Sequence, residues 1–276
     1  MTQSLGIAAI EANDSRKGIS WKFNLIGKLS DQHASRVFTA ATFHALADAI
    51  RPGISEGSTR NLSEQLVLAG MLQRVSNGLF LNKRAMPPAE LVEAAGYLRA
   101  GAVISLQSVL GEVGFLNNPS RVVYAVVPTS AAKRPKLGMH RTSAGNTFWF
   151  YGLAEKFFPN TGEDEFAMLR PGRPCQTFRP EAALLQWLHL AGMQRSSLTP
   201  PPFDVDMDTL DEQILNELAD RLGLTRQLEA WHKQAIAANF GAEPDLHDRL
   251  HQNKSATAAS AEEARQRLLA RRRNMP

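Results

Sequence analysis

Apolar residues recur every three or four positions between residues 36 and 50, a spacing that turns them toward one face of a helix. Pro52-Gly53 follows, and this dipeptide should end the helix. A second stretch repeats the helical spacing shortly afterwards, with an inward face formed by Leu62, Leu66 and Ala69. The pattern therefore predicts two short helices separated by a turn.

The ends of the second predicted helix carry their own signals. Ser58 or Thr59 can accept a hydrogen bond from a free backbone amide and so begin the helix. Gly70 readily adopts the left-handed backbone conformation in which many helices end. We therefore expect this helix to start near residue 58 and to end at residue 70.

A β-hairpin is predicted directly after the second helix. Short β-compatible runs at 71–75 and 79–81 flank the tripeptide Ser76-Asn77-Gly78. An Asn-Gly step between two such runs is the strongest local signal for a hairpin. Helix, turn, helix and hairpin in this order describe a winged helix-turn-helix. We assign it to residues 33–86, after an N-terminal arm over residues 1–32.

Beyond Pro87-Pro88, helical and strand-like patterns alternate. Strands are predicted at 121–127 and 147–151, where β-branched and aromatic residues gather. Helices are predicted at 89–98, from residues 102–105 on to Gly114, and at 180–190, 208–222 and 225–240. The predicted fold class is α+β: an N-terminal winged helix-turn-helix, then a larger α+β domain over residues 87–240 with a small antiparallel sheet and C-terminal helices. The polar, basic tail over residues 241–276 is expected to be partly disordered.

The second predicted helix carries the side chains expected to read DNA. The N-terminal half of such a helix enters the major groove, where Arg, Asn and Gln make bidentate contacts with base edges. We predict base contacts from Arg60, Asn61 and Gln65, with Ser63 and Glu64 also turned wholly or partly toward solvent. Phosphate contacts are expected from cations on or beside the hairpin. The full predicted DNA-binding set is Ser58, Thr59, Arg60, Asn61, Glu64, Gln65, Arg74, Asn77, Lys83 and Arg84.

Charge is distributed unevenly along the chain, whose formal net charge is +4. Residues 1–86 hold ten Lys and Arg against six Asp and Glu, and residues 247–276 hold seven against three. The segment between them therefore carries a net charge of −4. Basic ends around an acidic middle suit a protein that meets a polyanion with only part of its surface.

Several classes of protein are disfavoured by the sequence. No apolar run approaches the ~20 residues that a membrane-spanning helix needs. The N-terminal stretch lacks the basic-then-apolar order of a secretory signal. Cys175 is the only cysteine, which excludes an internal disulfide and a zinc site built from several thiolates. These features predict a cytoplasmic protein with no membrane partner.

Candidate catalytic and metal sites have little support. The chain has no phosphate-binding P-loop, no Gly-x-Gly-x-x-Gly and no Gly-x-Ser-x-Gly motif. His247 and His251 are four residues apart but lack an evident third ligand, so we interpret them as surface residues. Glu163-Asp164-Glu165 could bind a divalent ion, although a solvated loop is the simpler interpretation, and Cys175 has no base beside it in sequence. We predict no enzymatic activity, catalytic residue, cofactor or metal.

The ordered series of segments resembles the AbiEi family, the antitoxins and transcriptional regulators of AbiE-type abortive-infection toxin–antitoxin systems. The stretch from Leu66 through Arg74-Val75 to Gly78-Leu79-Phe80 is similar to the family's recognition helix and wing. Residues 98–114 resemble its segment "arginine-x-glycine, then serine-leucine-x-serine-x-leucine". The strand at 122–128 and the helix at 179–185 also fall where the family has them, so that the resemblance covers about residues 34–240.

This resemblance implies a repressor that binds inverted repeats in its own promoter, and a C-terminal domain that opposes a nucleotidyltransferase-like toxin. Carried over, residues 58–65 would form the groove-facing helix, and Arg74 with the turn at Asn77 would form the wing. The segment 1–32 and the basic tail after Phe240 depart from the family pattern. Either extension could change DNA affinity or oligomerisation.

Two alternatives from other functional classes stay open at the level of sequence. The winged helix could serve as a protein-interaction module that does not bind DNA. Alternatively, the chain could be a metal-dependent nuclease that uses the acidic cluster at 163–165, although it contains no Glu-x-Lys signature. Plasmid cleavage assays with magnesium or manganese would detect the nuclease, and DNA pull-down would separate the interaction module from a repressor.

Overall fold

The structure is a computed structural model that describes residues 19–118, 120–130, 135–159, 168–194 and 198–240. The chain is an α+β protein, as the sequence predicts, in which helices pack around two small sheets. Most of the 1–32 arm, the acidic cluster at 163–165, both histidines of the 247–251 pair and the tail from residue 241 lie outside the described residues.

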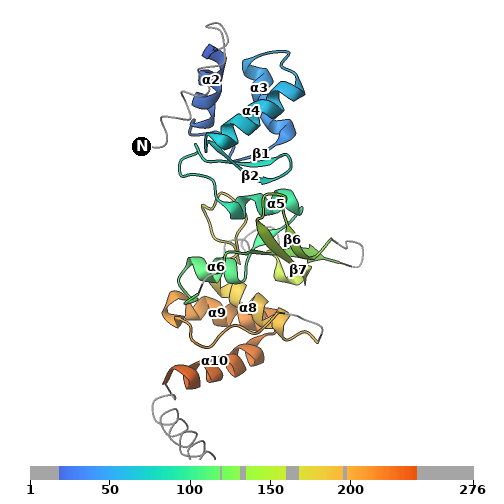
Figure 1. Cartoon of the computed structure of the whole chain (residues 1–276). Helices are drawn as coiled ribbons and strands as arrows, with labels where there is room; N and C mark the ends of the chain where they lie inside the picture. The colour runs from blue at the N-terminus through green and yellow to red at the C-terminus, as the bar shows by residue number, and fades with distance from the viewer. Residues whose placement is uncertain (1–18, 119, 131–134, 160–167, 195–197, 241–276) are drawn as a thin grey trace, which may run out of the picture.

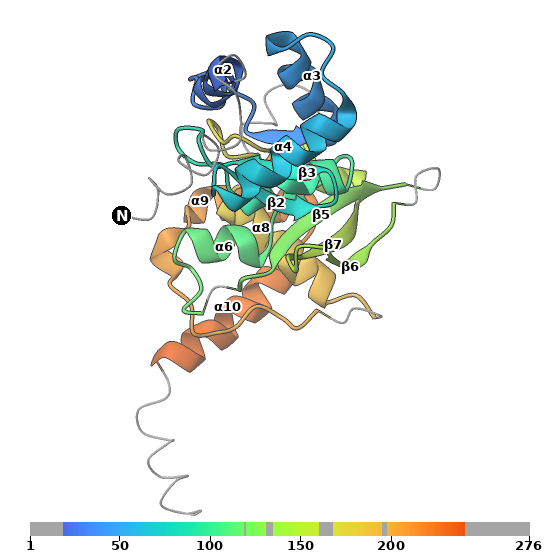
Figure 2. The same ribbon diagram turned by 45° about the horizontal axis from the view of Figure 1, so that its top comes forward.

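Residues 19–82 form an N-terminal module of helices packed on a three-stranded sheet. Its elements are α2 (Ile19–Leu29), β1 (Val37–Thr39), α3 (Ala40–Ile50), α4 (Glu56–Leu68), β2 (Leu72–Ser76) and β3 (Leu79–Asn82). The strands are antiparallel in the order β1-β3-β2, and Figure 2 shows α4 crossing over β2 and β3. The predicted order of helix, helix and hairpin is therefore present, with one strand before it.

That first strand corrects the sequence prediction of a helix over 36–50. Val37–Thr39 pairs with β3, and the helix starts only at Ala40, where the Thr39 side chain accepts a hydrogen bond from the amide of Thr42. A run of three residues is too short for its periodicity to distinguish a strand from a helix turn. These residues form a strand only because β3, about 40 residues later in the chain, pairs with them.

The second helix also begins earlier than predicted. Ser55, rather than Ser58 or Thr59, is the capping residue, and its hydroxyl accepts from the amide of Ser58. The hairpin is confirmed: β2 and β3 are joined at Asn77-Gly78, and Gly78 has the positive φ of +69° that such a turn favours.

Both faces of the three-stranded sheet are buried. Phe38 and Phe80 point toward α2, α3 and α4, where they join one hydrophobic cluster. Val37, Leu79 and Leu81 belong to a second cluster, which continues through the rest of the protein. The hydrophobic core therefore crosses the domain boundary that the sequence placed after residue 86.

A four-stranded sheet lies in the middle of the molecule (Figure 1). Its strands are β4 (Val103–Ile104), β5 (Val123–Thr129), β6 (Gly138–Arg141) and β7 (Thr147–Ala154), in the order β4-β5-β7-β6. The prediction that the small sheet is antiparallel is wrong for one pair of strands, because β5 and β7 are parallel. The unpredicted β6 reverses the chain between them and pairs antiparallel with β7, so the sheet is mixed.

Helices surround this sheet. They are η1 (Leu91–Ala94), α5 (Ala95–Leu98), α6 (Gln107–Glu112), η2 (Glu155–Phe157), α8 (Pro180–Ala191), η3 (Met207–Thr209), α9 (Glu212–Leu222) and α10 (Thr225–Phe240). The helix predicted over 89–98 is a 3-10 turn followed by one short α-helical turn. The helices predicted near 180–190 and 225–240 are confirmed, and the one predicted from 208 begins at Glu212.

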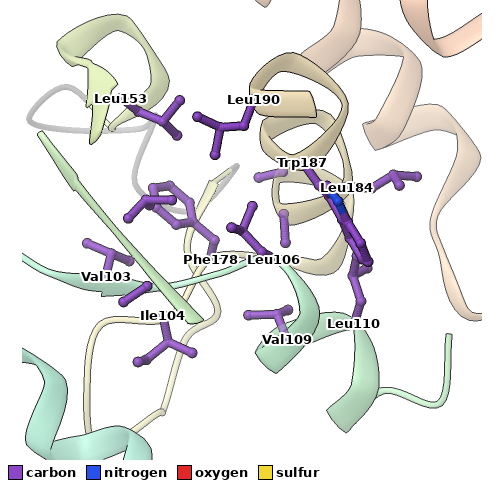
Figure 3. Packing of buried hydrophobic residues seen from close by; sticks show 14 of the residues in the cluster. Val103, Ile104, Leu106, Val109, Leu110, Leu153, Phe178, Leu184, Trp187 and Leu190 are labelled. Carbon is purple, nitrogen blue, oxygen red and sulfur yellow. The ribbon is translucent and has the colours of Figure 1, made fainter. Parts of the chain in front are cut away.

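Helix α8 is the centre of the larger core, because nearly all of its residues are buried. Figure 3 shows Leu184, Trp187 and Leu190 of this helix facing side chains from β4, α6, β7 and the segment before α8. At opposite ends of the molecule lie the N-terminal module and α10 (Figure 1). This arrangement leaves the outer surface of α3 and α4 at one end of the protein.

Candidate nucleic-acid interface

Helix α4 has a buried side and an outward side. Leu62 and Leu66 are buried against the module, as the spacing predicts. Along the other side, the exposed or half-exposed residues include Arg60, Asn61, Glu64, Gln65 and Leu68. The amphipathic pattern therefore placed Arg60, Asn61, Glu64 and Gln65 correctly on the outward side of this helix.

A groove of about 760 Å³ runs along one flank of α4. It separates the helix from the start of α3 and from the β2–β3 hairpin. Its lining residues are Ala40, Ala41, Phe43, His44, Glu56, Thr59, Arg60, Ser63, Glu64, Arg74, Asn77, Gly78 and Phe80. We call this feature the α4 groove.

The α4 groove divides the ten predicted DNA-binding residues into two groups. Five of them line it: Thr59, Arg60, Glu64, Arg74 and Asn77. The other five do not: Ser58, Asn61, Gln65, Lys83 and Arg84. Ser58, Asn61 and Gln65 are nevertheless exposed on the same helix, so α4 presents polar side chains on two adjacent flanks.

Two polar residues of α4 are buried, contrary to the expectation from the sequence. Thr59 is only 3% exposed, and its hydroxyl donates to the carbonyl of Ser55 and lies 3.0 Å from Nδ1 of His44. Ser63 is equally buried and donates to the carbonyl of Arg60. The Thr59 hydroxyl therefore links α4 to α3, whereas the Ser63 hydroxyl bonds within α4, and both side chains are too buried to match the predicted outward position.

Arg74 is held in place by two contacts. Its guanidinium forms an ion pair with Glu64 of α4 and lies over the ring of Phe80, 5.5 Å from the ring centroid. Phe80 is also the residue directly opposite Arg74 in the β2–β3 ladder. The side chain therefore sits beside α4, in the middle of the hairpin, instead of extending freely from the hairpin tip.

The remaining cations of the predicted set are bound elsewhere. Lys83 Nζ donates to the carbonyl of Ala89 at 2.7 Å, and Arg84 Nε donates to the hydroxyl of Ser30, just after α2. These contacts place both residues at the far end of the hairpin from the Asn77 turn. The structure does not bring them together with Arg60 or Arg74.

The hairpin turn itself is fixed from two sides. The Ala40 amide donates to the carbonyl of Gly78 at 2.7 Å, which ties the turn to the start of α3. Asn77 Oδ1 accepts from the hydroxyl of Ser143, in the turn between β6 and β7. The turn between β6 and β7 therefore lies beside the hairpin, a contact that no local sequence pattern predicts.

The charges around the α4 groove are balanced. Arg60 and Arg74 line it together with Glu56 and Glu64. Arg60 is exposed and forms no ion pair with any residue in the described part of the chain. Three lining residues were not predicted from the sequence: Glu56 at the start of α4, and Ala40 and Ala41 at the start of α3. The hydroxyls of Ser55 and Thr39, which cap these two helices, are the sequence signals that locate them.

Other reactive groups do not assemble into a second site. Within the described ranges, no three His, Cys, Asp or Glu side chains gather closely enough to hold a metal ion. Cys175 is half-buried, and burial raises the pKa of its thiol, although a hydrogen bond with Thr177 acts in the opposite direction. No helix in the described segments has the length and apolar character needed to cross a bilayer.

Comparisons with known proteins give only distant structural likenesses. No family model matches the chain, and no curated protein matches it. Among solved structures, the chain is similar to the crystal structure of the RV2827C protein from Mycobacterium tuberculosis, with 15% sequence identity and a TM-score of 0.42. The alignment covers 79% of this chain and 81% of that one. At this level of similarity the comparison assigns no family, and function has to be argued from the α4 groove and its surroundings.

Proposed function

We propose that this chain binds double-stranded DNA, with α4 in the major groove and the β2–β3 hairpin acting as a wing beside it. The order of strand, helix, helix and hairpin, with the two helices packed on a three-stranded antiparallel sheet, supports this proposal because it is typical of winged-helix proteins. The observation that carries the proposal is the exposed polar surface of α4. Arg60, Asn61 and Gln65 all project from it, and each can bond to a base edge in two places.

The local charge supports a polyanionic partner. Residues 19–86 hold eight Lys and Arg against four Asp and Glu, a net charge of +4. The α4 groove itself is balanced, so the excess lies outside it, for example at Arg51 after α3 and at Lys83 and Arg84 after the hairpin. Cations around a neutral reading surface attract the phosphate backbone and release its counterions.

The resemblance to AbiEi antitoxins extends the proposal to a biological role. In that role the protein represses its own promoter at inverted repeats and opposes a nucleotidyltransferase-like toxin. The larger α+β unit built on β4–β7 and α8–α10 would provide the contact with the toxin. The residues that carry the resemblance in this unit, 98–114 and 179–185, are largely buried around α8 and therefore account for its fold.

The test is fluorescence anisotropy with the duplex found directly upstream of the gene, compared with a scrambled duplex over a salt series. We expect tighter binding to the upstream duplex and a steep loss of affinity as salt rises. Arg60→Ala should lower preference for particular base pairs by about 1–3 kcal/mol.

Arg226→Ala is the matched control, because it removes the same charge from an exposed position on α10. It should change neither the affinity nor the preference. Weak, equal binding to both duplexes would contradict the proposal and make the α4 groove a protein-contact surface.

A further inference from the structure

The ion pair between Glu64 and Arg74 joins the two elements that are proposed to meet DNA. Glu64 comes from the middle of α4 and Arg74 from the first strand of the hairpin, and both line the α4 groove. Their side chains remain partly accessible, at 47% and 27% exposure respectively. The pair is therefore a preformed feature of the groove surface and can be approached from solvent.

The position of Arg74 is defined by more than its charge. The guanidinium group lies over the ring of Phe80, which is itself 4% exposed and packed in the core of the module. A β-bulge follows in β2, where the pairing shifts between Arg74 and Ser76. Stacking on a fixed ring and pairing with a carboxylate restrict the side chain to few rotamers, so little entropy is lost when it forms further hydrogen bonds.

The chemistry of the pair matches one kind of base pair. A guanine presents two acceptors, N7 and O6, in the major groove, and its paired cytosine presents the N4 amino donor next to them. Arginine offers two parallel donors, and glutamate offers an acceptor. An A·T pair presents a different order of donors and acceptors, together with the thymine methyl group.

We propose that Glu64 and Arg74 act together as a reader of a G·C base pair, with Arg74 donating to guanine N7 and O6 and Glu64 accepting from cytosine N4. This inference rests on the proposed DNA-binding function and assigns the source of its sequence preference. It also replaces the expectation that Arg74 contacts phosphate. A cation already neutralised by Glu64 adds little to non-specific attraction, whereas a fixed donor–acceptor pair discriminates between bases.

Substitution of Glu64 should change non-specific affinity and base preference in opposite directions, whereas substitution of Arg74 should reduce the base preference. Glu64→Gln removes one negative charge next to the DNA, so affinity for random duplex should rise. The same change replaces a pure acceptor with a group that also donates, so preference for G·C at one position should fall. Arg74→Lys keeps the charge but loses the planar pair of donors, and should reduce the preference at the same position.

The experiment is selection from duplexes with a randomised core, using the full chain and the variants Glu64→Gln, Arg74→Lys and Glu229→Gln. Glu229→Gln is the matched control, because it removes the same charge from an exposed position on α10 that does not line the α4 groove. Thermal unfolding of each variant checks that the fold is retained. The wild-type chain and Glu229→Gln should both enrich a motif with a G·C pair favoured about tenfold at one position.

Loss of that single preference in both Glu64→Gln and Arg74→Lys, with the rest of the motif retained, is the expected result. A motif that stays unchanged at every position in both variants overturns the inference and leaves the proposed DNA-binding function standing. Failure of the wild-type chain to enrich any motif overturns the proposed function, and the inference with it.

Discussion

At the scale of single residues, two fully buried amide side chains are matched with specific hydrogen-bond partners. Asn82 is fully buried in β3, and its amide donates to the carbonyls of Leu29 and Ser35, so that it joins the end of α2 to the sheet. Gln186 of α8 is also fully buried, accepting from the Ser105 hydroxyl and donating to the carbonyl of Phe157. Leaving any of these groups without a partner would cost about 1–3 kcal/mol.

A histidine on α8 makes stability depend on pH. Burial lowers the pKa of His189, and the nearby ammonium of Lys156 lowers it further; its ring lies 4.4 Å from that of Phe157. The unfolded chain therefore binds a proton more readily than the folded protein does. The stability that depends on neutral His189 is fully present above the ordinary histidine pKa of about 6.5. It is lost as the pH falls through the lower pKa that His189 has in the folded protein.

We expect the midpoint of urea unfolding to fall between pH 7.5 and pH 5, and to fall less in His189→Leu, which cannot take up a proton. The comparison isolates His189 from the carboxylates, because they are present in both proteins. The same decrease in the variant as in the wild type would contradict this assignment.

At the scale of elements, the structure shows that helix ends depend on short-range hydrogen bonds that several residues compete to make. Three hydroxyl residues, Ser55, Ser58 and Thr59, lie near the start of α4, and each is a chemically suitable cap. Ser55 takes the role because its backbone is extended and its hydroxyl reaches the amide of Ser58. Thr59 is turned inward to His44, so the register of the helix against α3 decides which hydroxyl is free to cap.

Ser55→Ala should therefore lower the free energy of unfolding by about 1 kcal/mol, the usual effect of losing a helix cap. Ser58→Ala is the matched control, because it keeps the backbone amide that donates to the Ser55 hydroxyl and removes only the exposed hydroxyl that accepts from it, so the loss should be smaller. Urea denaturation monitored by circular dichroism would compare the two. An equal loss in both variants would show that Ser55 has no special role in starting α4.

At the scale of the whole molecule, the N-terminal module is fixed to the larger unit. The two units share the hydrophobic core on one face of the β1-β3-β2 sheet, as shown by the buried side chains of Val75 and Leu79. Arg36, just before β1, adds a two-point ion pair with Glu93, at 2.7 and 2.8 Å. The orientation of α4 is therefore tied to the unit that is proposed to contact a toxin.

Removing the charge of Arg36 tests whether this ion pair stabilises the contact between the two units. Glu93 has a side chain that is only 2% exposed, so Arg36→Ala would leave a buried carboxylate without its cationic partner. Because Arg36 is itself partly exposed, we expect a loss of about 2–3 kcal/mol, less than the 3–5 kcal/mol typical of fully buried pairs.

Scanning calorimetry should show one unfolding transition in the wild-type protein and a lower melting temperature in Arg36→Ala. Lys28→Ala, which breaks an exposed ion pair with Asp31, serves as the control and should have little effect. Equal melting temperatures in the two variants would mean that the Arg36–Glu93 pair does not stabilise the contact between the units.

The sequence by itself determined the features that depend on local pattern. The spacing of Leu62 and Leu66 identified α4 and its polar side, and Asn77-Gly78 identified the hairpin, because helix faces and tight turns are properties of a few adjacent residues. The α+β class followed from the same local signals.

Only the tertiary structure decided features that depend on residues far apart in the chain. Val37–Thr39 becomes a strand because β3 lies beside it, and β5 and β7 become parallel because β6 returns the chain between them. The Glu64–Arg74 pair needs a helix and a hairpin to be placed side by side. Such contacts depend on pairing and packing in three dimensions, about which the periodicity of a single segment carries no information.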